Sequence, residues 1–111
     1  TGHNVAGPID TSARNSGISS SPASVSVSTN EPNCMILRLG GFDDDDITVD
    51  SPGLSGHTAI TMDKSGTGSF SVSGGAGYVI QAARGASDTS MFSLTASEEF
   101  VTMTISIKPA L

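Results

Sequence analysis

The stretch that decides the fold class is Phe100-Val101-Thr102-Met103-Thr104-Ile105-Ser106-Ile107-Lys108. Apolar and polar residues alternate strictly along it. Because successive side chains of a β-strand point to opposite faces of a sheet, this period of two predicts a strand with one buried face and one solvated face. We expect the apolar side chains to face the core and Thr104 to face solvent. The apolar set is Val101, Met103, Ile105 and Ile107.

Shorter runs upstream predict further strands. Phe92 and Leu94 share one face of a run that connects to the last strand through residues 96–99. Residues 34–39 are almost continuously apolar, which is typical of a central strand covered on both faces. No segment carries apolar residues at helical spacing over three turns, and turn signals recur about every 8–12 residues. The sequence therefore predicts an all-β chain, an antiparallel β-sandwich of jelly-roll or Ig-like type.

Two more strands are expected between the central run and the C-terminal pair. One covers residues 59–62, with Ile60 and Met62 inward, and the other covers residues 78–83, with Tyr78 in the core. The glycines of residues 74–77 would mark a bulge or a bend between two sheets.

The first 23 residues differ from the rest of the chain. They are rich in Gly, Ser, Asn and Pro, contain isolated Val5, Ile9 and Ile18, and show no period of 2 or 3.6. We therefore expect an extended N-terminal arm over residues 1–23, mobile in a monomer, and a sandwich domain over residues 24–111.

Composition argues against several partners. Eleven acidic and five basic residues give a net charge of −6, and the bases are scattered singly. Nucleic acid and anionic membrane surfaces are therefore unexpected partners, and no apolar stretch approaches membrane-spanning length. The single cysteine, Cys34, allows no internal disulfide and is expected to be a buried thiol. With no Trp and one Tyr, a glycan site would have few stacking platforms.

An acidic run is the candidate metal site. Closely spaced carboxylates suit calcium, which takes six to eight oxygen ligands. The spacing does not match an EF-hand, because the sixth and twelfth positions counted from Asp43 hold Thr48 and Leu54. The alternative is a solvated, self-repelling loop, or one that pairs with Arg38 and Lys64. The candidate calcium ligands are Asp43, Asp44, Asp45, Asp46 and Asp50.

No catalytic constellation is found in the sequence. His3 and His57 lie in Gly/Ser-rich segments, and no Gly-x-Ser-x-Gly elbow precedes a helix. The glycine clusters at residues 66–68 and 74–77 lack the following helix that phosphate binding needs. We therefore expect no enzymatic activity, no catalytic or cofactor-binding residues, and no cofactor other than calcium.

Three segments together resemble a type of uncharacterised β-sandwich module found in bacterial surface proteins and phage-like structural proteins. The segments are Cys34-Met35-Ile36-Leu37-Arg38-Leu39-Gly40-Gly41-Phe42-Asp43-Asp44-Asp45-Asp46-Ile47-Thr48-Val49, Gly74-Gly75-Ala76-Gly77-Tyr78 and Phe100 to Pro109. Such modules typically carry further strands and a Trp-containing segment upstream. The resemblance thus implies that this chain corresponds to the C-terminal portion, and that the remaining strands come from another chain or copy, or that the domain closes in a reduced form.

These observations predict a non-enzymatic structural module of an extracellular or virion assembly, such as a decoration, fibre or filament component. The expected location is extracellular, on a cell surface or on a virion. The chain begins at Thr1 rather than Met, as expected for a processed product or an excised piece. The arm and strand edges would contact another copy or another structural protein, giving a homo-oligomer or a larger assembly. The alternative is a calcium-dependent or glycan-binding adhesion module that uses residues 43–50.

Overall fold

The structure is a computed structural model that describes residues 2–110. The described residues contain no helix, and therefore no helix that is long and apolar enough to cross a membrane. They form nine β-strands: β1 (Ile9–Ser19), β2 (Ala23–Ser24), β3 (Ser28–Thr29), β4 (Cys34–Asp43), β5 (Thr58–Lys64), β6 (Val72–Gln81), β7 (Gly85–Ala86), β8 (Ser90–Met91) and β9 (Glu98–Ile107).

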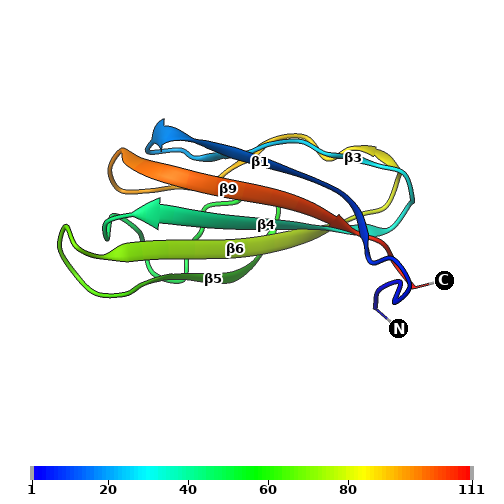
Figure 1. Ribbon diagram of the computed structural model, residues 1–111, viewed down its shortest axis with the longest axis horizontal. Helices are drawn as coiled ribbons and strands as arrows, with labels where there is room; N and C mark the ends of the chain where they lie inside the picture. The colour runs from blue at the N-terminus through cyan, green and yellow to red at the C-terminus, as the bar shows by residue number, and fades with distance from the viewer. Residues whose placement is uncertain (1, 111) are drawn as a thin grey trace.

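One large sheet dominates the molecule. Its five strands lie side by side in the order β1-β9-β4-β6-β5, all antiparallel (Figure 1). A second, thinner layer consists of the short pairs β2–β8 and β3–β7 and of the segment 44–57. The expected all-β antiparallel β-sandwich is therefore confirmed. We call the face of the large sheet that meets the second layer the inner face, and the opposite face the outer face.

The expected N-terminal arm is extended, but it belongs to the large sheet. β1 pairs with β9 from Ile9 to Ser19, with one register shift near Ile9. The expected boundary after residue 23 falls within the domain, because Ala23 and Ser24 form β2. Pairing uses backbone N–H and C=O groups, so a strand at the sheet edge does not need an apolar period. Thr1 and Leu111 lie outside the described residues.

The assignment of faces on β9 was wrong. Thr102, Thr104 and Ser106 are at most 1% exposed, whereas Val101 is 59% exposed and Met103 is 40% exposed. The inner face meets polar groups of the second layer. Ser24 and Thr104 share a hydroxyl hydrogen bond of 2.6 Å, and the Thr102 hydroxyl donates to the Ala23 carbonyl at 2.7 Å. Ile105 and Ile107 are half-buried on the outer face.

β4 is central in the sheet, as expected, but it is covered on one face only. Cys34 and Ile36 are buried on the inner face, as expected for the thiol, whereas Leu39 on the outer face is exposed. Gly40 and Gly41 lie inside β4 and do not end it.

The interior contains two apolar clusters. One, at the end of the sheet where β4 ends, includes Phe92 and Leu94 as expected, with Phe42 and Phe92 in edge-to-face contact at 5.3 Å. The other lies around Cys34 and Ile36. Between them the middle of the inner face is polar, with Arg38 at its centre.

Strands β5 and β6 depart from expectation in three places. Met62 is buried, but Ile60 is exposed at a register shift in β5. Tyr78 is half-buried on the outer face and is not in the core. β6 runs unbroken through the glycines, so they mark no bend between sheets. A Cβ atom on Gly75 would lie 2.5 Å from Met62 Sδ, so the glycine leaves room for the buried Met62 side chain.

Candidate functional site

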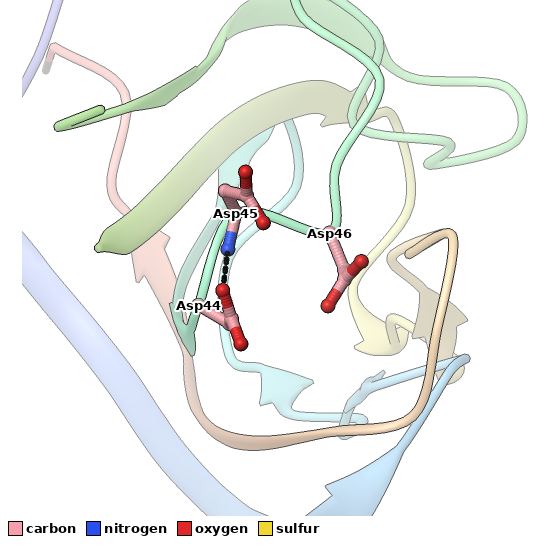
Figure 2. Close-up of side chains that lie close together, drawn as sticks. All are labelled: Asp44, Asp45 and Asp46. Carbon is pink, nitrogen blue, oxygen red and sulfur yellow. Dashed lines mark hydrogen bonds between the residues drawn. The ribbon is translucent and has the colours of Figure 1, made fainter. Parts of the chain in front are cut away.

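The acidic loop, which we define as residues 44–46, follows β4 at one end of the large sheet. Asp44, Asp45 and Asp46 each offer a carboxylate oxygen, and these oxygens lie within 4.8 Å of one another. Figure 2 shows them on consecutive residues, with the Asp45 N–H donating to Asp44 Oδ1 at 2.9 Å. Of the other two candidate ligands, Asp43 is the last residue of β4, and Asp50 lies beyond the loop with its N–H bonded to the Met62 carbonyl. Neither belongs to the group of three.

Several oxygens of this group already accept hydrogen bonds that order the loop. Asp45 Oδ2 accepts from the Gly68 N–H at 2.9 Å, and Asp46 Oδ1 accepts from the Thr95 hydroxyl at 3.4 Å. The bond from Gly68 lowers the pKa of Asp45. The Asp45 N–H lowers the pKa of Asp44, but desolvation and the neighbouring carboxylates outweigh it, so the net shift is upward.

Sequence reasoning missed Glu98, which lies against the acidic loop. A carboxyl contact with Asp46 raises the pKa of Glu98 to about 7, with added contributions from desolvation and from the charges of Asp46, Asp44 and Asp43. The contact follows from strand register, because Phe42 pairs with Phe100 and brings the start of β9 beside the end of β4. No local pattern around Glu98 predicts it.

Arg38 does not pair with the acidic run. Its guanidinium is 1% exposed and donates to the carbonyls of Ser24, Val25, Ser87 and Asp88 and to His57 Nε2, at 2.6 to 3.5 Å. Desolvation lowers its pKa, although the nearby Asp88 charge opposes this. Since Arg38 ties three segments of the second layer to β4, its role is structural.

His57 also has a structural environment. Its Nε2 accepts from Arg38, so its Nδ1 carries the proton and donates to the Ser55 carbonyl at 2.9 Å. With both ring nitrogens in use, the arrangement provides no free base beside a nucleophile. His3 is exposed and forms an isolated bridge with Pro109.

The outer face is the second candidate site. Residue pairing places apolar side chains of three adjacent strands in successive rows across it, for example Met103–Leu39–Ala76 and Ile105–Leu37–Tyr78. Val72 and Ile80 are 61% and 53% exposed near its two ends. The apolar residues of the three central strands on this face are Met35, Leu37, Leu39, Val72, Ala76, Tyr78, Ile80, Val101, Met103, Ile105 and Ile107.

Depressions lie at both ends of this face. The larger, of about 810 Å³, lies at the end nearer the acidic loop. Gly41, Ile18, Val72 and Val101 are among the residues that line it. A smaller one of about 300 Å³ includes Met35, Ile80 and Ile107. Sequence reasoning identified these side chains as one face of strands but assigned several of them to the protein's own core.

Comparison with known proteins gave no matching family model, no matching curated protein and no matching solved structure. Function therefore has to be argued from the geometry of this chain.

Proposed function

We propose that this chain is a non-enzymatic structural module that assembles with other protein through the outer face of its large sheet. The observation that carries the proposal is the exposure of apolar side chains on that face, with Val72 and Val101 each about 60% exposed. Contiguous apolar patches larger than a few hundred Å² are rare on monomeric soluble proteins, and where they occur they mark interaction sites.

The size of the face fits this role. With a strand spacing of about 4.8 Å and a rise of about 3.3 Å per residue, five strands of about ten residues cover about 24 Å by 33 Å. The footprint is therefore about 800 Å², which equals the surface that each partner contributes to a specific interface of standard size, about 800 Å².

The setting we propose is an extracellular or virion assembly. Its support is the sequence resemblance together with the acidic, Ser/Thr-rich surface. The non-enzymatic part of the proposal is supported by hydrogen bonds that occupy the Arg38 guanidinium and both ring nitrogens of His57.

A double substitution tests the assembly surface. Val72→Thr with Val101→Thr keeps residue shape and strand propensity but replaces two exposed methyl groups by hydroxyls. We expect weaker concentration-dependent association in sedimentation velocity, with a thermal midpoint at low concentration within a few degrees of wild type. A control, Phe92→Ala in the interior, should lower the midpoint strongly. A midpoint loss for the double variant as large as that of the control would contradict the proposal.

The alternative function is calcium-dependent adhesion, including adhesion to a glycan, through the acidic loop. The observation that favours it is the mutual proximity of the Asp44, Asp45 and Asp46 carboxylates. Oxygen ligands on an irregular loop suit calcium, and Glu98 would add a fourth carboxyl beside Asp46.

Isothermal titration with calcium chloride tests this alternative. Wild type should bind calcium, and Asp44→Asn with Asp46→Asn should abolish binding. Without calcium, the double variant should melt at the same temperature or higher, because like-charge repulsion is relieved. Asp63→Asn with Glu31→Gln, which removes two carboxylates outside the loop, is the charge-matched control. Absence of calcium binding by wild type would refute the alternative, and a large calcium-free loss would show that the two carboxylates hold the fold.

A further inference from the structure

We propose that the partner on the outer face is a second copy of this chain, lying antiparallel to the first in a twofold-symmetric sandwich of two large sheets. This inference rests on the proposed function. It adds the identity of the partner and the orientation in which that partner lies.

A second copy matches the face in extent and chemistry. Sheets that pack face to face use apolar side chains on both inner surfaces and lie about 10 Å apart. The three central strands supply apolar side chains in rows across the outer face, and the edge strands flank them with polar residues such as Arg14 and Thr61. The footprint of all five strands, about 800 Å², suits a partner of equal size. A twofold contact needs only one such surface, because the same patch serves both copies.

Charge distribution selects the orientation. The end of the sheet where β4 ends and β9 begins carries seven carboxyl groups, with Lys64 as the nearby base. They belong to Asp43, Asp44, Asp45, Asp46, Asp63, Glu98 and Glu99.

The opposite end, where the two chain termini lie (Figure 1), is balanced. Lys108 and Arg84 follow the ends of β9 and β6 there, against Glu31 and Asp10. Two copies stacked with like ends together would bring two acidic ends within a Debye length of about 8 Å to 10 Å. An antiparallel arrangement separates them by about the length of the sheet.

The twofold axis would run between the two sheets, perpendicular to the strands, over the row that contains Leu39. Leu39 lies in the middle row of the outer face, between Met103 and Ala76, and β4 is the central strand of the five. In a twofold contact, residues on the axis meet their own counterparts, so the two Leu39 side chains would pack against each other. A charge at this position would be buried and unpaired in the dimer but exposed in the monomer.

The first experiment measures the dimer by sedimentation equilibrium on the full chain. Wild type should form a dimer, and Leu39→Lys should weaken it by at least about 100-fold, as for a residue at an interface centre. Phe70→Lys is the matched control, because Phe70 is fully exposed in the turn before β6, beyond the end of the outer face. It should leave the dissociation constant unchanged. A dimer that survives Leu39→Lys would overturn the inference, because the contact would lie elsewhere.

The second experiment measures orientation with a nitroxide spin label at Phe70→Cys. Cys34 is fully buried and does not compete for the label. In the antiparallel dimer the two labels lie at opposite ends, more than about 35 Å apart from strand rise and spacing; like ends together would bring them to about 20 Å. A distance near 20 Å would overturn the antiparallel arrangement while leaving the outer face as the assembly surface.

A monomeric wild type at all concentrations would overturn the second copy as partner. A dye that fluoresces on apolar surfaces then tests the proposed function by itself. Binding to wild type but not to Leu39→Lys would retain an outer face open to another protein, whereas equal binding to both would overturn the proposed function as well.

Discussion

The two faces of the large sheet have opposite chemistry, and the inner one is the more polar in its middle. There, Arg38, Thr102, Thr104 and Ser106 are almost completely buried. On the outer face of the same strands, Leu39, Val101 and Met103 are exposed. An alternating strand therefore identifies two distinct faces, but it does not identify the face that the chain itself covers. On the inner face Arg38, Thr102 and Thr104 bond to the chain's own second layer, whereas the buried Ser106 hydroxyl has no hydrogen-bond partner. The apolar outer face is not covered by any of the described residues.

The largest expected effect comes from the centre of the inner face. Arg38→Ala should destabilise the domain by about 3 kcal/mol to 5 kcal/mol, because it leaves buried carbonyls of the second layer without donors. Arg38→Lys should recover only part of this, since an ammonium has three donors and lacks the planar fork. Urea unfolding at low protein concentration measures both.

Arg84→Ala is the control for the loss of an arginine. Arg84 is exposed in the segment after β6, so its removal should change stability by at most about 0.5 kcal/mol. If Arg38→Ala costs no more than Arg84→Ala, water satisfies those carbonyls and the polar inner face does not hold the second layer.

A reciprocal pair of substitutions on β9 measures the difference between the faces directly. Thr104→Val removes the buried hydroxyl that bonds Ser24 and should cost about 1 kcal/mol to 3 kcal/mol. Val101→Thr makes the opposite exchange on the outer face and should change monomer stability by less than about 0.5 kcal/mol. Denaturant unfolding of both variants provides the comparison.

The alternating pattern alone predicts the reverse order. If the apolar set faced the protein's own core, Ile105→Ala would cost about 2 kcal/mol to 5 kcal/mol and Thr104→Ala well under 1 kcal/mol. A small effect of Thr104→Val together with a large one of Val101→Thr would therefore show that the faces described here are inverted.

Much of the fold is nevertheless predictable from local sequence. The all-β class, the C-terminal strand, the buried thiol of Cys34 and the interior positions of Phe92 and Leu94 follow from periodicity and residue type. β1 was missed as a strand because the bonds that hold an edge strand are made by the backbone, which carries no side-chain pattern. The polar character of the inner face was not predicted, because a buried arginine is favourable only where carbonyls from distant segments converge on it. Here those carbonyls include the ones of Ser24 and Asp88.

The candidate metal site also has a part that the sequence predicts and a part that it does not. Consecutive aspartates are visible in the sequence, and the structure brings Asp44, Asp45 and Asp46 together. Glu98 joins them only because β4 and β9 pair with Phe42 opposite Phe100. Its position could not be predicted without the register.

The smallest expected effect is a pH dependence of stability at the acidic end of the large sheet, where Glu98 lies on the inner face and Glu99 on the outer face. The pKa of Glu98 is raised from its ordinary value of 4.5 to about 7, chiefly by its carboxyl contact with Asp46. Between these values the folded protein binds a proton that the unfolded chain has released. Stability therefore falls as pH rises through this window, and the contribution of this proton is complete below pH 4.5 and lost above about pH 7. The raised pKa of Asp44 acts in the same direction, whereas the lowered pKa values of Asp10 and Asp45 act at more acidic pH.

Glu98→Gln isolates this contribution. The amide donates a hydrogen bond toward Asp46 at every pH, so the variant should melt at a higher temperature than wild type at pH 8. Its thermal midpoint should also change less than that of wild type between pH 4.5 and pH 7. Glu99→Gln is the matched control, because it removes the same formal charge from the opposite face of β9 and should keep the wild-type slope. Melting curves at several pH values and fixed ionic strength measure the three proteins. If Glu98→Gln and Glu99→Gln flatten the profile equally, the pH dependence reflects the summed charge of the acidic end, and the specific contact of Glu98 with Asp46 does not account for it.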